Sequence, residues 1–464
     1  MKKMPKVWSV ALLMVILLGV LMTCLIFLKV QPHIPLIGCT VILVLFALMH
    51  GARWLDIEGG LVEGIHKGLK PIMILALVGV VIGVWMASGT VPYLVFIGFE
   101  LINPKWFLVT ALISTMIVST FTGSSFTTIG TVGAALMGIG MGFGIDPAVC
   151  AGAVICGACF GDKMSPLSDT TNFSPAVAGV DIFTHIRHMM WTTVPAVLVT
   201  FIIFVFLGRN TAADVSMADI TAAKHALESS FNLSWLVMVS PLIVVIMAFL
   251  KKPIIPVLIT GIVTGAITAL FMQNGMTVSS LIKTMQNGFH LKTSNDLVSN
   301  IVNRGGLQSM MSSISLIFIA LGFGGIAQKV GLIDIMIQCV IKKIHRKGHY
   351  VTAAALSSIG VNIMTGEQYL SILLPGQAYQ KVFDKKAIPR KTLSRTLEDG
   401  GTLVNPLIPW GVSGAFFTQA LGVHVTEYLP FVFFLYLSPL FTIAMAYLPK
   451  LRNVTLNHQL EKVS

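Results

Sequence analysis

Residues 7–28 form a single apolar run, and runs of similar character recur through the whole chain. A helix needs about 20 apolar residues to cross the hydrocarbon core of a bilayer, and this run reaches that length. The apolar part of a secretory signal peptide is shorter, so the run is predicted to be the first membrane span. Of the 464 residues, 55% are hydrophobic and only 11% are charged, which excludes a soluble globular domain. The predicted fold class is an all-α polytopic membrane protein.

The basic residues predict how the spans are oriented. The formal net charge is +12, but Lys and Arg cluster in short segments between apolar runs. Cytoplasmic loops of membrane proteins carry such an excess of Lys and Arg. We therefore expect the N- and C-termini on the cytoplasmic side, and we infer no nucleic-acid partner.

The first half, residues 1–208, is expected to hold five crossings and one hairpin. The polar residues Thr122–Ser125 interrupt its hairpin and would form a re-entrant tip, although two ordinary spans also fit this pattern. His185 and His188, at the basic start of the last span, are expected at the cytoplasmic interface. The predicted segments are the spans 7–28, 34–50, 71–88 and 189–207, an amphipathic helix at 53–70, a short apolar segment at 91–102, the hairpin at 105–141 and a broken crossing at 147–181.

The second half, residues 233–449, is expected to repeat this layout after an external linker. The linker, residues 209–232, is polar and slightly acidic, which is typical of an external segment. The predicted segments are the spans 233–250, 254–271, 306–327 and 430–447, an external polar segment at 272–300, a hairpin at 350–380, a broken crossing at 400–421 and a cytoplasmic tail at 450–464. The basic residues expected at the cytoplasmic surface behind the hairpin are Lys381, Lys385, Lys386, Arg390, Lys391 and Arg395.

Residues 161–172, GDKMSPLSDTTN, place two carboxylates, an ammonium and four hydroxyls inside an otherwise apolar crossing. A helix broken at membrane depth frees backbone carbonyls and amides. A bilayer tolerates these groups only where protein or a water-filled cavity satisfies them. Ionisable residues inside a span also mark ion or substrate pathways. We interpret this stretch as the transport centre.

Short similar segments occur in the same order in both halves, although Gly- and Val-rich membrane sequence also produces chance identities. An odd number of crossings in each half would invert the second copy relative to the first. Inverted repeats are common in secondary transporters, whose binding sites lie near the midplane where broken helices of both halves meet. The matching segments are Val109–Ala111 with Val351–Ala353, Thr122–Gly123 with Thr365–Gly366, Ser165–Leu167 with Asn405–Leu407, and Gly179–Val180 with Gly422–Val423.

Four interruptions are therefore expected to converge on one site: the hairpin tips at 122–125 and 365–368 and the breaks at 161–172 and 405–411. Sodium prefers hard oxygen ligands, which carboxylates, hydroxyls and freed carbonyls supply. The candidate ion- or substrate-binding residues are Thr122, Gly123, Ser124, Ser125, Asp162, Ser165, Ser168, Asp169, Thr170, Thr171, Asn172, Thr365, Gly366, Glu367 and Asn405.

Asp162, Asp169 and Glu367 are the candidate proton-carrying residues, and the hypothesis places Na⁺ at the first two. Glu398 and Asp399 also lie near membrane depth. Burial makes a carboxylate hold protons more tightly and a nearby cation opposes this, so sodium and protons compete for the same oxygens. Competition of this kind produces antiport.

Structural roles for the same side chains remain as alternatives. Asp162 could form an ion pair with Lys163 or with another basic residue. Asp169 could cap the helix that follows it, and Glu367 could reach cytoplasmic water. These alternatives differ from ion binding in the partner that each carboxylate contacts.

The sequence predicts no cofactor. Cys156 and Cys159 have C-x-x-C spacing, but the chain has no second such pair. Small thiols in a helix rich in Gly and Ala are better explained by close helix packing than by a metal or redox site.

Residues 161–172, followed by Pro175–Gly179, resemble the signature of the NhaC-type sodium/proton antiporter family. The chain length, the two-halved layout and the segment Thr184–His188 agree, so the resemblance covers essentially the whole chain. The family belongs to the ion transporter superfamily. The resemblance implies two inverted repeats with re-entrant hairpins, an elevator-like movement of the substrate domain, and location in the bacterial inner membrane.

The expected function is that of a secondary active transporter that exchanges Na⁺ for H⁺ by alternating access. Proteins similar to this family exchange malate for lactate or carry amino acids or amines, so an organic cargo is the alternative. Arg304 and Asn405 could then meet a carboxylate. The expected partners are small ions, a small organic acid or amino acid in the alternative case, and the lipid bilayer. The sequence leaves open whether the chain forms a homodimer.

An intramembrane hydrolase is disfavoured. Asp162 and Asp169 could act as an acid pair, or Ser124 and Ser125 as nucleophiles. The chain contains neither an H-E-x-x-H nor a G-x-S-x-G motif, however, and hydrolysis does not need an inverted repeat. We therefore do not expect an enzyme.

Overall fold

The computed structural model describes residues 7–28, 30–211, 217–250, 252–291, 293, 296–342 and 344–448, which form helices and loops with no strand among them. Among these residues, eight helices are long and apolar enough to cross a membrane, or up to ten if each of two bent helix pairs is one span. The prediction of an all-α polytopic membrane protein is confirmed. The terminal residues 1–6 and the predicted tail at 450–464 lie outside the described residues.

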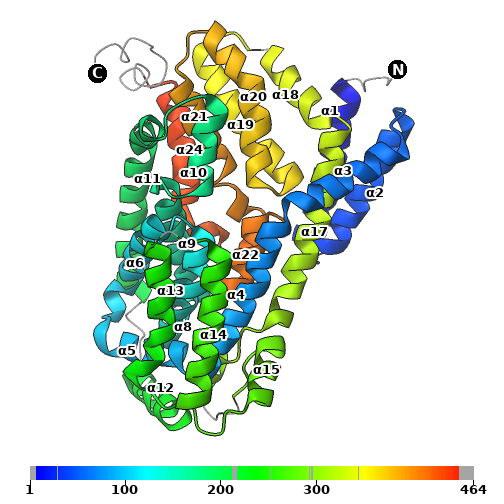
Figure 1. Ribbon diagram of the computed structural model, residues 1–464. Helices are drawn as coiled ribbons and strands as arrows, with labels where there is room; N and C mark the ends of the chain where they lie inside the picture. Colours follow the sequence, from blue (N-terminus) through cyan, green and yellow to red (C-terminus); the bar gives the residue numbers. More distant parts are fainter. Residues whose placement is uncertain are drawn as a thin grey trace.

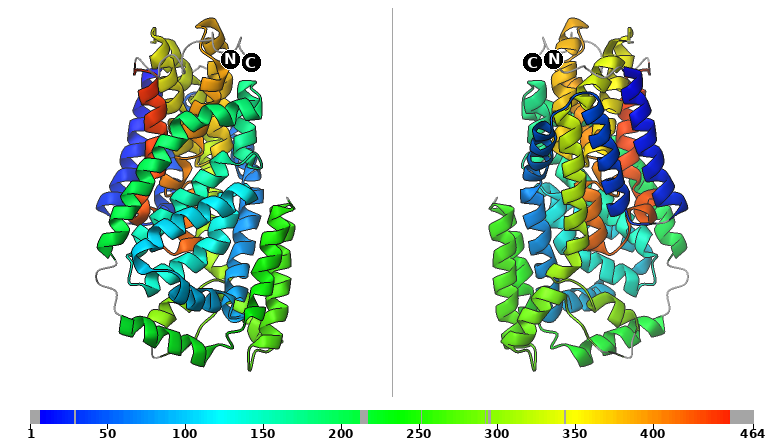
Figure 2. Two further views of the ribbon diagram at one scale, coloured as in Figure 1. Left: turned by 90° about the vertical axis from the view of Figure 1, so that its left-hand side faces the viewer. Right: turned by 90° about the vertical axis from the view of Figure 1, so that its right-hand side faces the viewer.

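The helices form a bundle with two distinct ends (Figures 1 and 2). The upper end in Figure 1 holds the start of α1 (Val7–Met22), α18 (Leu332–Lys342), the outer ends of α19 (Lys347–Thr365) and α20 (Gln368–Lys385), and the end of α24 (Phe433–Met445). The opposite end holds α12 (Met217–Ser230) and α15 (Val278–Asn287). α12 belongs to the predicted external linker. The linker therefore lies at one end of the bundle, and the helix ends that carry basic residues lie at the other.

Five helices form an outer group along one side of the bundle. The predicted amphipathic segment is α3 (Trp54–Lys67), which packs lengthwise on α17 (Leu307–Lys329). Glycine makes this contact close, because a Cβ atom at Gly64 would lie 2.1 Å from the backbone oxygen of Leu321. The remaining members are α4 (Leu69–Ala87), α13 (Val239–Phe249) and α14 (Ile254–Met272), with α14 packed against both others, while α2 (His33–Met49) contacts α17 from outside.

The first predicted hairpin is interrupted at the predicted residues. After α5 (Thr90–Leu101), α6 (Phe107–Thr122) ends at Gly123, and the chain becomes helical again at α7 (Ser125–Thr128). It continues through a π-helical turn, Ile129–Gly133, into α8 (Ala134–Gly142). Each arm of the hairpin could cross a membrane, judged by its length and composition. The hairpin and the two-span interpretations therefore both fit these helices.

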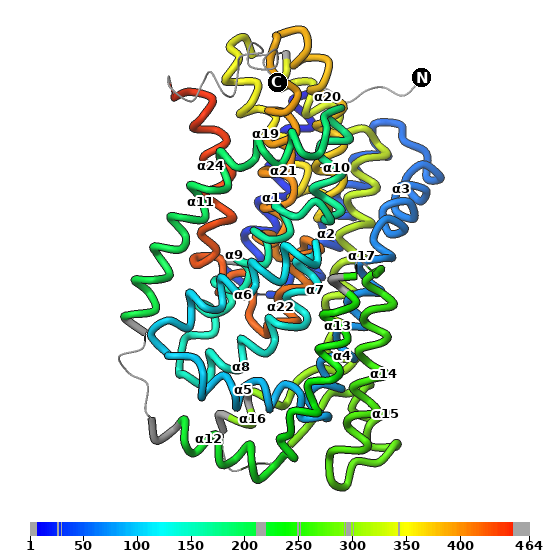
Figure 3. The backbone as a smooth tube through the Cα atoms, turned by 60° about the vertical axis from the view of Figure 1, so that its left-hand side comes forward, coloured from blue at the N-terminus to red at the C-terminus, as the bar shows by residue number. Residues whose placement is uncertain are grey.

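The second hairpin, α19 and α20, is interrupted at Gly366 in the same way. Its outer ends lie beside α18, whereas α8 of the first hairpin runs toward the end of the bundle that holds α5 and α16 (Asp296–Val302) (Figure 3). The two hairpins therefore open toward opposite ends of the molecule.

Two crossings are broken in the middle. In the first half, α9 (Pro147–Met164) is followed after four residues by the short α10 (Asp169–Ala178). In the second half, α21 (Arg390–Gly401) leads through a 3₁₀ turn, Asn405–Leu407, to α22 (Val412–Leu421). Gly179 and Gly422, which the sequence comparison pairs, end α10 and α22 in the left-handed conformation, with φ of 70° and 72°.

The sequence-based boundary of the second broken crossing is wrong. Arg390, Lys391 and Arg395 were expected at the cytoplasmic surface, but α21 already begins at Arg390, and every residue from Thr392 to Gly401 is buried. Arg395, expected to be exposed, is fully buried. α10, α11, α19, α20 and α24 surround the helix, so its polar side chains meet neighbouring helices instead of water. A polar helix enclosed by other helices has the sequence pattern of a surface helix.

α11 (Ile182–Thr211) begins before the predicted residue 189 and contains both histidines. His185 and His188 are buried, with exposures of 0% and 5%, so their side chains face neighbouring helices and not solvent. The Nδ1 atom of His185 lies 2.6 Å from the Ser394 hydroxyl, and His188 Nε2 lies 3.3 Å from that of Thr392. Both imidazoles therefore contact α21.

The predicted loops contain additional helices. In the linker, α12 follows residues 212–216, which lie outside the described part of the chain. The external polar segment 272–300 includes α15 and the start of α16, and the loop at 422–429 includes α23 (Val425–Tyr428). Their polar composition led us to expect loops, although polar residues are equally common on short surface helices.

Candidate functional site

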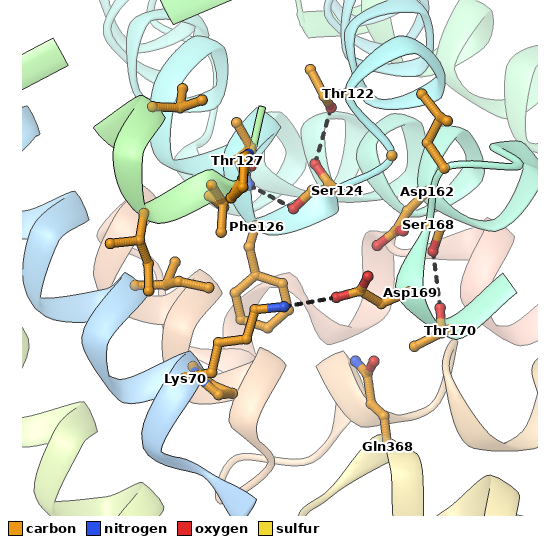
Figure 4. Close-up of a pocket in the computed structure, with 18 of the residues that line it drawn as sticks. Lys70, Thr122, Ser124, Phe126, Thr127, Asp162, Ser168, Asp169, Thr170 and Gln368 are labelled. Atoms are coloured by element: carbon orange, nitrogen blue, oxygen red, sulfur yellow. Dashed lines mark hydrogen bonds and ion pairs between the residues drawn. The ribbon is translucent and has the colours of Figure 1, made fainter. Parts of the chain in front are cut away.

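A cavity of about 650 Å³ lies where three of the four predicted interruptions meet (Figure 4). It is bounded by the first hairpin tip, the break between α9 and α10, the second hairpin tip, and the ends of α3, α4 and α14. Its lining residues are Lys67, Lys70, Pro71, Ile74, Thr122, Gly123, Ser124, Phe126, Thr127, Asp162, Leu167, Ser168, Asp169, Thr170, Lys252, Pro253, Ile254, Ile255, Pro256, Val257, Glu367, Gln368, Tyr369 and Val412. We call this space the ion cavity.

The first hairpin tip is a helix stop followed directly by a helix start. Gly123 adopts φ of 66°, and its N–H donates to the Ser119 carbonyl at 2.8 Å, which ends α6. Ser124 is the N-cap of the next helix, where its hydroxyl accepts from the Thr127 N–H at 3.2 Å. The tip therefore presents the carbonyl end of one helix and the amide end of another to the cavity.

Asp162 joins this tip to the broken crossing. The Ser125 hydroxyl donates to Asp162 Oδ2 at 2.6 Å, and the Ser125 backbone N–H donates to the same oxygen at 3.0 Å. The Ser168 side chain also lies close to this carboxyl group (Figure 4). Asp162 is half-buried and lines the cavity, so neutral donors orient its carboxylate while one side faces the cavity space. Such a carboxylate can accept a cation or a proton.

The second hairpin tip has the same backbone conformation as the first, but a different type of residue caps the helix that follows. Gly366 has φ of 65°, and Glu367 accepts the Leu370 N–H at 2.7 Å as the N-cap of α20. The Glu367 side chain therefore has a structural hydrogen bond as well as a place in the cavity wall. The expected alternative, that this side chain reaches bulk water, is wrong because its exposure is only 5%.

Asn405 lies behind the second tip and fastens it to the broken crossing. Its Nδ2 donates to the Gly366 carbonyl at 2.9 Å and to Asn362 Oδ1 at 2.7 Å, while its Oδ1 accepts from the Ser413 N–H at 2.7 Å. Asn405 is fully buried and does not line the ion cavity. Its hydrogen bonds position the tip.

Asp169 occupies the mouth of the cavity. Its carboxylate lies 3.2 Å from the Lys70 ammonium of α4, and the two side chains are 65% and 62% exposed (Figure 4). The helix cap at this point is Ser168, which accepts from the Thr171 N–H at 3.4 Å, and not Asp169. Asp169 is thus a solvent-accessible carboxylate paired with a flexible lysine.

The structure brings together about half of the predicted binding residues in one cavity wall. Those that line the ion cavity are Thr122, Gly123, Ser124, Asp162, Ser168, Asp169, Thr170 and Glu367. Those that do not line it are Ser125, Ser165, Thr171, Asn172, Thr365, Gly366 and Asn405. Among the latter, the Thr171 hydroxyl donates to the carbonyls of Asp162 and Lys163, and Asn172 Nδ2 donates to those of Pro166 and Ser168.

Arg304 does not belong to this group. It lines a second cavity of about 350 Å³ together with residues such as His290 and Asn303. There its guanidinium donates to the Leu421 carbonyl at 3.2 Å, at the end of α22. Arg304 therefore lies at the other end of the α22 helix from the ion cavity.

Sequence reasoning missed the partner of Lys163. This ammonium is fully buried and forms an ion pair with Asp399, so it does not pair with Asp162. Asp399 is also fully buried and accepts from the hydroxyls of Ser438 (2.7 Å), Thr192 (3.2 Å) and Thr442. The sequence did contain a signal for this pair, because Lys163 and Asp399 carry opposite charges near membrane depth, one in each half. Buried charges in a membrane require partners.

No group of three or more His, Cys, Asp or Glu side chains that could hold a metal ion occurs in the described part of the chain. Sodium differs from such metals, because hydroxyls and carbonyls complete its coordination. In the ion cavity these oxygens come from two helix ends and from Ser168 and Thr170. The oxygens in the cavity wall, including the carboxylates of Asp162, Asp169 and Glu367, are of the kind that a hard monovalent cation prefers.

Comparisons with known proteins agree with this chemistry. Residues 157–449, which include the break at 161–172, match the Na⁺/H⁺ antiporter family. The Na(+)/H(+) antiporter NhaC of Alkalihalophilus pseudofirmus is 55% identical over 448 residues, 97% of each chain. NhaC of Bacillus subtilis is 49% identical and covers 94% of this chain and 97% of the relative. The malate-2H(+)/Na(+)-lactate antiporter of Bacillus subtilis is 33% identical, with 93% and 92% covered.

Proposed function

Because this chain belongs to the Na⁺/H⁺ antiporter family, we propose that it is a secondary transporter that exchanges Na⁺ for H⁺ across the bacterial inner membrane. It is a multi-pass membrane protein and a transporter rather than an enzyme. Na⁺ and H⁺ are its transported ions. The observation that carries the proposal is the position of the Asp162 carboxylate in the wall of the ion cavity, between a hairpin tip and a broken helix.

Sodium would bind at Asp162. The Ser125 N–H and hydroxyl hold one carboxylate oxygen in a fixed direction, and Ser168 and Thr170 add hydroxyl oxygens from the start of α10. Backbone carbonyls at the end of α6 supply further hard ligands. Asp169, at the mouth of the cavity, would attract the cation first. The cation would then move from Asp169 to Asp162 when Lys70 moves away. The pairing of Lys70 with Asp169 is weak because both side chains are exposed.

Proton coupling follows from competition for negative charge in the cavity. A cation bound at Asp162 and a proton bound nearby both neutralise the same negative potential, so binding of one opposes binding of the other. Glu367 adds a second carboxylate to the wall, although its hydrogen bond to Leu370 ties it to the end of α20. Alternate exposure of this site to the two sides of the membrane turns the competition into antiport.

The moving part would consist of the hairpins and the broken helices. These elements pack on one another across the halves, as α10 does with α20 and α21, whereas α3, α4, α13, α14 and α17 form the outer group. The cavity lies between the two groups, so sliding of one against the other would carry Asp162 across the membrane. The opposite opening of the two hairpins supports a division into inverted repeats at 1–208 and 233–449 (Figure 3).

The orientation in the membrane follows from the positive-inside rule. The end of the bundle that holds α18–α20 carries Arg346, Lys347, Lys381, Lys385 and Lys386, and we assign it to the cytoplasm. Both chain termini would then be cytoplasmic. Three lysines in the wall of the ion cavity, Lys67, Lys70 and Lys252, support a cytoplasm-facing cavity in this conformation.

An organic acid is the second candidate cargo. The cavity volume of about 650 Å³ exceeds the needs of a bare ion, and the lysines in its wall could meet a carboxylate. The starts of α10 and α20 also face the cavity, and helix N-termini favour negative charge. One relative at 33% identity is named as a malate-2H(+)/Na(+)-lactate antiporter. Sodium would then be the coupling ion.

Flux measurements on purified protein in lipid vesicles distinguish these functions. An inward sodium gradient should produce a proton flux in the opposite direction with no organic substrate present. Malate, lactate and amino acids are then added one at a time. A sodium response that appears only with an organic compound would reassign the cargo, and no response under any condition would reject the proposed transport function.

A further inference from the structure

Glu398 is a carboxyl group in the centre of the bundle that does not line the ion cavity. It lies on α21, and its exposure is 0%. One carboxyl oxygen, Oε2, accepts a hydrogen bond from the Ser174 hydroxyl of α10. The other, Oε1, is buried and has no hydrogen-bond partner among the described residues. An ionised carboxylate in such a position is unfavourable, because burial removes the water that would otherwise solvate its charge.

A second unpartnered oxygen lies one helical turn further along the same helix. The Thr402 hydroxyl is buried, forms no hydrogen bond within the described residues, and lies close enough to Glu398 to interact with it. A protonated carboxyl can donate its hydrogen to this hydroxyl, whereas an ionised carboxylate can accept the hydroxyl hydrogen. Both oxygens are satisfied in either case. The pair therefore provides a place where a proton can bind and leave without moving the backbone.

Charged and titratable side chains surround Glu398, but Lys163, which is close enough to neutralise it, is paired with Asp399. The one ionisable residue of α10, Asp169, is at the mouth of the ion cavity, and those of α19 lie in its first turn, at the end of the bundle. Tyr436 of α24 donates to the Leu429 carbonyl. Other such groups on the neighbouring helices include Asp162 of α9, His185 and His188 of α11, Tyr379 of α20, and Arg395 and Asp399 of α21 itself. Tyr369 of α20 lines the ion cavity, and Arg187 of α11 and Lys381, Asp384 and Lys385 of α20 are exposed.

α10 connects Glu398 to the ion cavity. Thr170 lines the cavity, and Ser174, one turn later, donates to Glu398. Between them, the Thr171 hydroxyl donates to the carbonyls of Asp162 and Lys163 at 3.1 and 3.0 Å. Asp162 itself is close enough to Glu398 for their charges to interact. Two carboxylates in a medium of low dielectric constant repel, so a charge on one favours a proton on the other.

We propose that Glu398 is the proton-binding site of the transport cycle and that it is separate from the sodium site in the ion cavity. This inference rests on the proposed antiport function. While Asp162 is empty and negative, Glu398 holds a proton. Sodium at Asp162 cancels that charge, the O–H bond of Glu398 breaks, and the proton passes to water. Sodium adds one positive charge to the pair formed by Asp162 and Glu398, and the departing proton removes one. The total charge of the pair therefore stays the same.

Two transport modes measured on the same vesicles test this inference. Sodium-driven proton movement requires both sites, whereas exchange of labelled sodium for unlabelled sodium, at equal concentration on both sides, requires only the sodium site. Glu398→Gln keeps the size of the side chain but carries no exchangeable acidic proton. The matched control is Glu58→Gln, because Glu58 is an exposed residue of α3 outside both sites.

The expected result is a split between the two modes. Glu398→Gln should lower sodium-driven proton movement by roughly tenfold or more, while sodium–sodium exchange continues and no longer depends on pH. Glu398→Asp, which retains a carboxyl group, should recover proton movement with a shifted pH profile. Glu58→Gln should behave as wild type in both modes. This pattern is not expected if Glu398 only holds helices together.

Three results would overturn the inference while leaving antiport by the wild type intact. One is normal proton movement in Glu398→Gln, and another is loss of both modes in a folded Glu398→Gln protein. If that variant does not fold, Glu398→Asp decides, and an unchanged pH profile there counts against the inference. Absence of sodium-driven proton movement in the wild type is a separate outcome, which rejects the proposed antiport itself.

Discussion

Asp162 and Asp399 occupy similar places in the two halves, each near the end of the helix that precedes a break, yet their surroundings differ. Asp162 lines a cavity and is held by neutral donors, the backbone and hydroxyl of Ser125. Asp399 is sealed from solvent and paired with Lys163 and three hydroxyls. A carboxylate with neutral partners and access to a cavity can exchange a cation for a proton. A carboxylate that already has an ammonium partner, as Asp399 has, is neutralised within the protein.

The largest effect is expected at the sealed carboxylate. Asp399→Asn leaves the Lys163 ammonium buried without a counter-charge, which should lower the free energy of unfolding by about 3–5 kcal/mol. Unfolding of the purified variant in detergent, monitored by heat or denaturant, measures this loss. Lys163→Met combined with Asp399→Asn removes both charges and should recover most of the stability. Wild-type stability in the single variant would show that the pair is not structural.

The next largest effect is expected at the donor that orients Asp162. Ser125→Ala removes the hydroxyl hydrogen bond but leaves the backbone N–H in place, so sodium affinity should fall by about 10- to 100-fold, as it does when outer-shell partners of metal ligands are lost. The sodium concentration that gives half-maximal exchange measures this change. Ser229→Ala, at an exposed position of α12, is the control. Equal sodium dependence in the two variants would remove Ser125 from the ion site.

A smaller effect is expected at the second hairpin tip. Glu367→Gln removes the charge but keeps an oxygen that can accept from the Leu370 N–H, so stability should change by less than about 1 kcal/mol. Sodium affinity should change by no more than about fivefold, because a charge several ångströms away across water contributes about 1 kcal/mol or less. Titration of exchange with sodium gives the value. A complete loss of proton coupling would instead make Glu367 the proton carrier.

The smallest effect is expected at the cavity mouth. Lys70→Ala removes a positive charge beside Asp169, so sodium affinity should rise by about two- to threefold at low ionic strength. The gain should disappear at high ionic strength, because salt screens exposed charges. Lys283→Ala, an exposed change on α15 at the other end of the bundle, is the control. A gain that persists in high salt would indicate a direct ligand role for Lys70.

Much of the fold could be predicted from the sequence, because apolar runs and their interruptions report directly on helices in a membrane. The breaks at Gly123, Gly366 and residues 165–168 lie where Gly, Pro and hydroxyl residues cluster. The failure at α21 has a physical cause. A polar segment between apolar runs is ordinarily a loop in water, and only the packing of five other helices around α21 makes it internal.

The candidate site could be predicted in position but not in its contacts. Carboxylates and hydroxyls at membrane depth identify Asp162, and repeated Thr-Gly segments identify the two tips. The sequence contains no signal that Lys163 points away from its neighbour Asp162, because adjacent residues on a helix face different directions, about 100° apart. Nor does it indicate that Ser125, rather than the neighbouring Ser124, would bond to Asp162, since that depends on how the tip meets α9.

Sodium binding to purified Asp162→Asn protein tests the central claim most directly. We expect the variant to unfold at the same temperature as the wild type without sodium, because the groups that donate hydrogen bonds to this side chain are neutral. Its sodium affinity should fall by about 100-fold or more, since Asp162 is the proposed direct ligand. Asp146→Asn, a conservative change at an exposed helix cap, should bind sodium normally. Wild-type sodium affinity in Asp162→Asn would contradict the account.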